Sequence, residues 1–412
     1  DKEGNPLYPH ILWADQRSWR ESNWIKEQIS EQRLFELTGL KATETKPLSK
    51  ILWLQRNEPD VFANTHRFLN CKDYLVFRMT NRICTDPSDA SSTLLFHILD
   101  EAWSVDLCHT FGVPIEKMPD VVQSSAIAGY VTPQAADSTG LLPGTPVVMG
   151  GGDGCAANLG AGCVEDGDVH LSLGTSAWIM QSSDAPLNRV EDGLYNYCHV
   201  VPGMYSPTGA MQAAGSSYRW FSDIIELGRE DRLSFEKDMR AIKPGANGLL
   251  YLPHLMGERS PYWNPKARGA FLGLKRETSR EEMMRAILEG VAMHLAVIRE
   301  RFDPTADQIN SVNAIGGGAR SDLWCQILSD VMRVRVNRLS RLEEAGGLGV
   351  AVLAGVGTKL FSDFNVIHKF QTVERVFEPE SNSASFYESR LALFKEAYEV
   401  TRHIQAKLAD GM

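Results

Sequence analysis

One stretch of the chain has an uninterrupted helical pattern of apolar residues. Between Arg280 and Phe302, apolar side chains recur at alternating intervals of four and three residues, as one face of an α-helix requires. Ser279 and Glu282 have the spacing of a capping box, in which each side chain bonds to the backbone of the other residue. The pattern therefore predicts a core-facing helix over 280–302. Its apolar positions are Met284, Leu288, Val291, Leu295, Ile298 and Phe302.

Shorter apolar runs and amphipathic segments alternate along the rest of the chain. The short runs predict strands at 147–149, 169–173, 177–180, 248–255 and 311–315. The amphipathic or small-residue segments predict helices at 18–37, 49–56, 71–79, 219–227, 350–356 and 385–407. One more helix is expected after Asp322, which we interpret as its N-cap.

A glycine-rich stretch between residues 147 and 176 has the strongest chemical signal. Gly150 to Gly152 follow a predicted strand and let a ligand approach the main chain closely, which places Asp153 at the mouth of a cleft. The next strand ends in Gly174-Thr175-Ser176 and a further strand follows, so free N–H groups and hydroxyls of the turn can bind phosphate oxygens. We interpret Asp153 as a base for a substrate hydroxyl and the turn as a site for the phosphates of ATP.

Three other positions allow two interpretations each. Trp13 either ends a strand before a helix cap or forms a pocket wall that stacks on a polyol. Asp86 and Asp89 could be an acid/base pair, but a capped, solvated turn is the preferred interpretation. Arg259 pairs either with Glu258 or with a distant acid, and the sequence does not choose between a structural and a functional role.

A second glycine loop, Gly316 to Ser321, lies between the strand at 311–315 and the following helix. A nucleotide can lie against the backbone of such a loop. The dinucleotide-binding fingerprint fails because Ser321 occupies its last glycine position, and no Walker-type phosphate loop occurs in the sequence. Dehydrogenases and Walker-type enzymes are therefore disfavoured.

Composition limits the class of partner. With 412 residues, of which 43% are hydrophobic, the chain is long enough for two domains. The net charge of -10, without a basic block, argues against nucleic acid and anionic membranes as partners. The longest stretch without charged residues, 193–218, is interrupted by Gly and Pro, so no membrane span is expected. A small-molecule substrate fits best.

The seven cysteines have no C-x-x-C spacing, so we expect reduced thiols and a cytoplasmic location. The first residues, Asp1 to Pro6, have neither an initiator Met nor an apolar segment and are typical of a turn inside a domain. We therefore expect the chain to begin late.

Several motifs occur in a specific order: WADQRS, KILWLQRNEP, CKDYLVFRMTN, DPSDASST, GGGDG, SLGTS, GERSPYWNP, GAFLGL with ILEGVA, and GGGARSDLWCQILSDV. Each is weak alone, but the ordered set is specific and runs nearly from end to end. The sequence resembles the FGGY carbohydrate kinases.

The resemblance implies an α/β fold of two actin-like, ribonuclease-H-like domains with a cleft between them. Residues 1–166 would form an incomplete sugar-binding domain that lacks the first phosphate loop, so we expect this chain to be weak or inactive as a kinase. Residues 167–412 would form the ATP-binding domain. The partners implied are a small sugar, ATP and Mg²⁺, without nucleic acid or membrane, and a homodimer is compatible with the sequence.

The resemblance favours transfer to the 5-hydroxyl of D-xylulose. Gluconate or another sugar or polyol is the alternative, because Asp153 followed by Gly154 also resembles the gluconate-kinase branch. A non-catalytic, ATP-binding actin-like interaction protein is a second alternative, since fold does not fix function.

Individual roles also follow from the resemblance. Asp153 matches the catalytic base and contacts the sugar, and Trp13 matches an aromatic position that lines a polyol site. No residue is assigned as a metal ligand. The residues expected to bind the nucleotide are Gly174, Thr175, Ser176, Gly215, Gly317, Gly318, Ala319 and Asp322.

Overall fold

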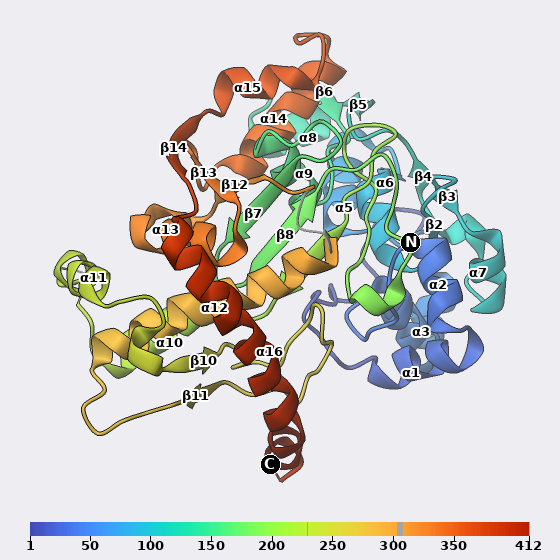
Figure 1. Ribbon diagram of the computed structural model, residues 1–412. Coiled ribbons are helices and arrows are strands. Elements are labelled where there is room, and N and C mark those ends of the chain that lie inside the picture. The colour runs from blue at the N-terminus through green and yellow to red at the C-terminus, as the bar shows by residue number, and fades with distance from the viewer. Residues whose placement is uncertain (229, 303–307, 412) are drawn as a thin grey trace.

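The structure, a computed structural model, describes residues 1–228, 230–302 and 308–411. Its largest sheet has six strands in the order β14-β13-β12-β7-β8-β9 (Figure 1). β7, β12 and β13 run parallel, whereas β14, β8 and β9 pair in antiparallel fashion. The strands are β7 (Val169–Leu173), β8 (Ala177–Gln181), β9 (Thr208–Met211), β12 (Ser311–Ile315), β13 (Arg335–Leu339) and β14 (Val373–Phe377).

The predicted helix at 280–302 is confirmed as α12 (Arg280–Phe302), and it forms the centre of the largest core. The capping box is present, with Glu282 N donating to Ser279 Oγ at 3.1 Å and Ser279 N donating to Glu282 Oε2 at 2.9 Å. α12 packs against the sheet and against α10 (Gly215–Ile224), α13 (Asp322–Met332) and α16 (Ser381–Asp410). All six predicted apolar positions are buried, which is why the periodicity identified this helix.

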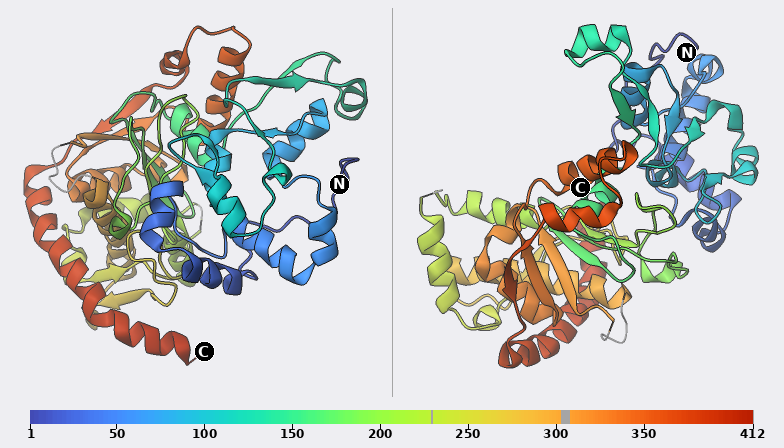
Figure 2. Two further views of the ribbon diagram at one scale, coloured as in Figure 1. Left: turned by 90° about the vertical axis from the view of Figure 1, so that its right-hand side faces the viewer. Right: turned by 90° about the horizontal axis from the view of Figure 1, so that it is seen from above.

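The amino-terminal third consists of helices with small two-stranded sheets, and it lies to one side of the six-stranded sheet (Figure 2). Within the described ranges, no helix is both long and apolar enough to cross a bilayer. The elements of this part are α1 (Trp19–Gln28), α2 (Glu31–Thr38), α3 (Pro47–Asn57), α4 (Pro59–Asn64), α5 (Cys71–Thr80), β1 (Cys84–Thr85), α6 (Pro87–Ala90), β2 (Phe96–His97), β3 (Ala102–Trp103), α7 (Val105–Thr110), β4 (Asp120–Val121), β5 (Ile127–Tyr130), α8 (Pro133–Thr139) and β6 (Pro146–Val148).

The single helix predicted at 18–37 is wrong, because the structure has two helices there, α1 and α2. Ile29 between them is extended, and the Ser30 side chain accepts a hydrogen bond from Arg33 N and so begins a new helix. Gly39 ends α2 with a φ of 72°, a left-handed conformation that suits glycine.

The strand predicted at 248–255 is shorter than expected. It covers only β10 (Leu250–Leu252), which pairs with β11 (Ala270–Leu272). Pro253 follows directly and has no N–H to donate, so the ladder ends there. The helix predicted at 219–227 begins earlier, at Gly215.

Two helices with small side chains cross at very short range and join the two halves of the chain. α9 (Asp153–Gly160) packs on α14 (Ala345–Gly357). A Cβ atom added at Gly160 would lie 1.7 Å from Ala345 O, and one added at Gly349 would lie 1.9 Å from Ala156 O. Only glycine permits this approach, so the two backbones are in direct contact.

We expect Gly160→Ala and Gly349→Ala to destabilise the protein. Alanine favours a helix by about 1 kcal/mol over glycine, but the new methyl group forces the helices apart, at a cost of about 1–3 kcal/mol or more. Gly347→Ala is the matched control, because a Cβ there meets nothing within 4 Å and should stabilise the protein. Urea unfolding of the three variants measures the difference. Equal effects at Gly160 and Gly347 would contradict the packing argument.

Candidate functional site

Asp153 is the first residue of α9, and its side chain is exposed. Its Oδ1 accepts a hydrogen bond from Gly154 N at 2.8 Å, and the N-terminal end of a helix favours such a negative charge. The glycine turn before it is held in place, because Gly152 N donates to Ser88 Oγ at 2.9 Å. A Cβ at Gly154 would lie 3.2 Å from Met180 Cε of β8, so Asp153 stands beside the β7–β8 hairpin.

The interpretation of Asp86 and Asp89 as a solvated turn is wrong. Asp86 caps the short helix α6 as expected, but its side chain is completely buried and accepts hydrogen bonds from Ser88 Oγ and Ser124 Oγ. Lys72 Nζ lies 3.0 Å from Asp86 Oδ1 and 3.4 Å from Asp89 Oδ2. Burial raises the pKa of Asp89 to about 7, against the effect of Lys72. Through Ser88, which bonds to both Asp86 and Gly152 N, this cluster holds the glycine turn in place.

The Gly174-Thr175-Ser176 turn connects β7 to β8 as predicted. Gly174 N donates to Ser176 O at 3.0 Å, and the segment that follows β9 holds the turn from the other side. There, Gly215 N donates to Gly174 O at 2.9 Å and Ser216 N donates to Thr175 O at 3.0 Å. The structure therefore brings together four of the predicted nucleotide-binding residues.

The second glycine loop lies beside this turn. Because β7 and β12 are parallel neighbours, Gly174 and Gly316 follow them at the same edge of the sheet, where ligands of α/β proteins bind. A Cβ at Gly318 would lie 2.6 Å from Leu173 Cγ, so Gly318 is also close to the end of β7. Gly317 is exposed next to it, whereas the Ala319 side chain is fully buried and faces the core.

The prediction that Asp322 caps α13 is wrong. Ser321 is the N-cap, because its side chain accepts a hydrogen bond from Trp324 N. The Asp322 carboxylate instead forms ion pairs with Arg338, at 2.6 Å, and with Arg375. Its role in adenosine binding stays a prediction.

Trp13, the predicted polyol-stacking residue, lies beside Arg259. The Trp13 side chain is 68% exposed, and the Arg259 guanidinium carbon lies 5.6 Å from the centroid of its ring. Arg259 also faces Tyr195: burial raises the pKa of the Tyr195 hydroxyl, and the charge and hydrogen bonding of Arg259 oppose this. The hydrogen bond that the structure shows from Arg259 to Glu258 comes from the backbone N, at 2.8 Å from Oε1.

Sequence reasoning missed Lys46 and Tyr197. Lys46 Nζ donates to the Tyr197 hydroxyl at 3.3 Å and lies 5.2 Å from the Tyr197 ring centroid. Burial and the nearby charge of Arg259 lower the pKa of Lys46 to about 7. In the sequence, Lys46 is simply a lysine before a proline at a helix start, and no local pattern connects it to a tyrosine on a distant segment.

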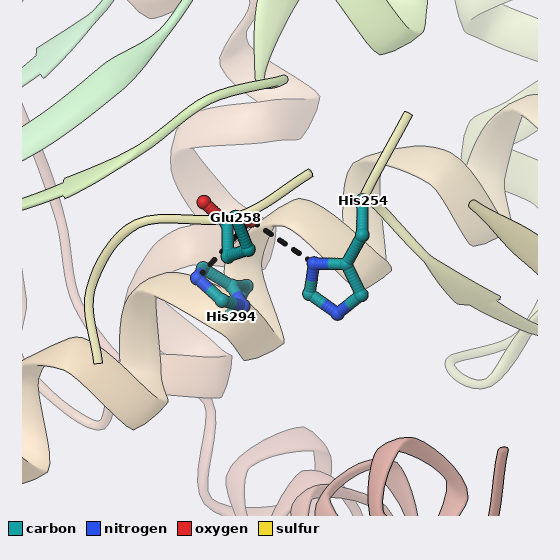
Figure 3. Close-up of side chains that lie close together, drawn as sticks. All are labelled: His254, Glu258 and His294. Atoms are coloured by element: carbon teal, nitrogen blue, oxygen red, sulfur yellow. Dashed lines mark hydrogen bonds and ion pairs between the residues drawn. The ribbon is translucent and has the colours of Figure 1, made fainter. Parts of the chain in front are cut away.

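A buried cluster of His254, Glu258 and His294 joins the loop after β10 to α12 (Figure 3). Its ligand atoms lie within 4.8 Å of one another, as a metal site would require. Glu258 Oε2 lies 3.0 Å from His254 Nδ1 and 3.4 Å from His294 Nε2. Glu258 Oε1 accepts from Gln212 N at 2.9 Å and from Arg259 N.

These contacts favour a hydrogen-bonded junction over a metal centre. Metal-bound histidines normally hold their second ring nitrogen with an acceptor, but His254 Nε2 and His294 Nδ1 have no hydrogen-bond partner among the described residues. The junction links the segment before Gly215 to the loop of Arg259. Glu258 thus connects the backbone at Gln212 to the backbone at Arg259.

We expect Glu258→Ala to lower the free energy of unfolding by at least about 3 kcal/mol, because each buried donor that loses its acceptor costs roughly 1–3 kcal/mol. Glu258→Gln keeps an oxygen for the two backbone N–H groups and should lose about half as much. Glu343→Ala, which removes an exposed ion pair with Arg320, is the control and should change stability by less than about 1 kcal/mol. Denaturant unfolding tests the order, and equal losses for Glu258→Ala and Glu343→Ala would refute it.

Comparison with known proteins gives a consistent result over both halves of the chain. Residues 1–160 match the N-terminal domain of the FGGY family of carbohydrate kinases, and residues 169–358 match its C-terminal domain. A xylulose kinase of Staphylococcus xylosus is 31% identical over 402 residues, which are 97% of this chain and 82% of the relative. A gluconokinase of Bacillus subtilis (strain 168) is 28% identical over 424 residues, covering 100% of this chain and 82% of the relative.

A solved structure agrees with these relatives. The crystal structure described as a xyloylose kinase from Brucella ovis superposes with a TM-score of 0.89 at 29% identity, covering 98% of this chain and 82% of the other. The two-domain actin-like fold implied by the motifs is therefore confirmed. The chain belongs to the FGGY family of carbohydrate kinases.

Proposed function

We propose that this protein transfers the γ-phosphate of ATP to the 5-hydroxyl of D-xylulose, with Asp153 as the general base. The observation that carries the proposal is the position of Asp153: an exposed carboxylate on a fixed glycine turn, beside the β7–β8 hairpin. Relatives named xylulose kinase, at 31% and 32% identity, support this acceptor.

Phosphoryl transfer depends mainly on positioning and charge neutralisation. In the proposed reaction, Asp153 accepts the proton of the attacking hydroxyl while the turn at Gly174 to Ser176 holds phosphate oxygens. The glycine loop at Gly317 and Gly318 offers backbone against which the nucleoside lies. FGGY kinases use ATP. Mg²⁺, when bound, would neutralise charge on the transferring phosphate.

Three further properties belong to the same proposal. We place the domain boundary at residues 166/167, which agrees with matches that end at 160 and resume at 169. The seven cysteines are all free thiols, and most are buried, which suits the cytoplasm. A homodimer is the proposed assembly.

Asp153→Asn should lower kcat by about 100- to 10,000-fold, the usual contribution of a general base, with little change in stability. A coupled ADP-release assay with D-xylulose and Mg-ATP, on a chain extended by the first phosphate loop that the resemblance implies, measures the effect, and Asp137→Asn, on the exposed surface of α8, is the control. If the activity survives in Asp153→Asn, Asp153 is not the base. If the protein binds ATP but releases no ADP with any sugar, the alternative of a non-catalytic actin-like protein gains support.

A further inference from the structure

A buried network of hydrogen bonds joins α9 to the β7–β8 hairpin. Asn158 on α9 and His170 on β7 are both completely buried. His170 Nδ1 lies 2.5 Å from Asn158 Oδ1, and Trp178 Nε1 on β8 donates to His170 Nε2 at 3.2 Å. Three side chains thus connect the helix to both strands of the hairpin.

The network continues from Asn158 to the segments that follow α9 and β8. Asn158 Nδ2 donates to Ser182 Oγ at 2.9 Å, and Ser182 Oγ donates to Cys163 O at 3.1 Å. His199 Nε2 lies 3.3 Å from the same hydroxyl, and His199 Nδ1 accepts a hydrogen bond from Val201 N at 2.8 Å. The side chains of Ser182 and His199 are buried as well.

One arrangement of protons satisfies the whole network. An indole N–H can only donate, so His170 Nε2 accepts and the ring proton lies on Nδ1. That proton goes to Asn158 Oδ1, which turns the amide NH₂ group toward Ser182. Burial lowers the pKa of His170 to about 3, so the ring is neutral, as this arrangement requires. A buried network in which each group has its partner specifies one arrangement of its segments.

The network lies between two parts of the proposed site. α9 begins with Asp153, and β7 leads directly into the predicted phosphate turn. His170 and Met180 are partners in the β7–β8 ladder, and a Cβ at Gly154 would lie 3.2 Å from Met180 Cε. Gly154 and Asn158 are four residues apart and share one face of α9. This face therefore lies on the hairpin along one turn of the helix.

The other face of α9 has a different kind of contact. Gly160, two residues beyond Asn158 and so on the other side of the helix, packs on the backbone of α14. Apolar burial has no preferred direction, whereas a hydrogen bond weakens steeply when it is misaligned. The contact with α14 sets how close the helices come, and the network sets how α9 is rotated on the hairpin.

We propose that Asn158 and His170 are positioning residues, which hold Asp153 at the distance and orientation from the phosphate turn that phosphoryl transfer requires. The inference rests on the proposed function, because both side chains are buried and act only through Asp153. Loosening the network leaves the binding groups on each side formed but misaligns them. The effect should therefore appear in kcat rather than in KM.

The test removes the hydrogen bonds of Asn158 and keeps the size of its side chain. In the ADP-release assay with the extended chain, D-xylulose and Mg-ATP, Asn158→Leu should lower kcat by about 10- to 100-fold. KM for both substrates should change by less than about 3-fold. A higher KM with unchanged kcat would overturn the proposal.

Ser329→Ala is the matched control for a loss of stability alone. The Ser329 hydroxyl is buried and donates to Val334 O and Phe377 O, at the opposite edge of the sheet from the predicted phosphate turn. This variant should lower the free energy of unfolding in urea and leave kcat unchanged. If kcat falls as much in Ser329→Ala as in Asn158→Leu, the kinetic effect has no specific cause and the proposal is wrong.

Two further comparisons separate positioning from a general loss of structure. His170→Gln keeps an acceptor for Trp178 and a donor for Asn158, so kcat should stay within about 5-fold of the original. His170→Leu keeps neither and should lose as much as Asn158→Leu. Equal losses for the two His170 variants would contradict the proposal.

A double variant shows whether Asn158 acts through Asp153. In a chain that already has Asp153→Asn, Asn158→Leu should lower the residual kcat by less than about 3-fold, because the residue that it positions has lost its function. If the two losses multiply, the network acts on another part of the reaction and the proposal is wrong.

Failure of the network and failure of the proposed function give different results. D-xylulose turnover that Asn158→Leu leaves unchanged overturns the positioning role alone. No turnover of any sugar by the unaltered extended chain overturns the proposed function, and amide hydrogen exchange then decides the network. Exchange at least about 10-fold faster in Asn158→Leu, confined to α9 and the hairpin, supports the network, whereas unchanged exchange overturns it.

Discussion

The direct backbone contact between α9 and α14 is the constraint on which the site depends. Asp153 is the first residue of α9, and α14 belongs to the part of the chain that matches the C-terminal family domain. With no side chain between the helices at Gly160 and Gly349, the position of Asp153 relative to that part is fixed by main-chain packing. Side-chain contacts could adjust by rotamer changes, but a backbone contact cannot.

Two buried carboxylates extend this rigidity to the loops around the site. Asp86 holds the loop that binds the glycine turn before Asp153. Glu258 accepts hydrogen bonds from the backbone of both Gln212 and Arg259, so the segment before Gly215 and the loop of Arg259 share one anchor. Buried acids are costly to desolvate, and hydrogen bonds from several donors offset that cost here. The loops of the site are thus supported from the interior.

Local patterns in the sequence predicted what depends on local physics. The burial of α12 followed from its periodicity, and the β7–β8 hairpin followed from two apolar runs around a glycine turn. The errors arose where one polar side chain decides the outcome, as at Ser30 and Ser321, which cap helices. In both cases the serine side chain accepts a hydrogen bond from the backbone N–H three residues further on. The sequence pattern had instead predicted one continuous helix at Ser30 and an N-cap at Asp322.

Other features depend on contacts between distant segments and have no local signal. The meeting of Lys46 with Tyr197, and the burial of Asp86, arise only when the chain is folded. The ordered motifs placed the candidate residues in a family, and the structure then showed which of them meet. The contact of Gly215 with the turn at Gly174 is one that the structure shows, whereas Ala319 faces the core. The phosphate-binding role of the turn stays a prediction.

The ion pairs of Asp322 have a consequence for how a nucleoside is recognised. With Asp322 neutralised by Arg338 and Arg375, and with Ala319 buried, the second glycine loop presents mainly its main chain at the sheet edge. On the proposed assignment, a nucleoside on this loop would lie against backbone, beside the exposed ion pair of Arg320 with Glu343.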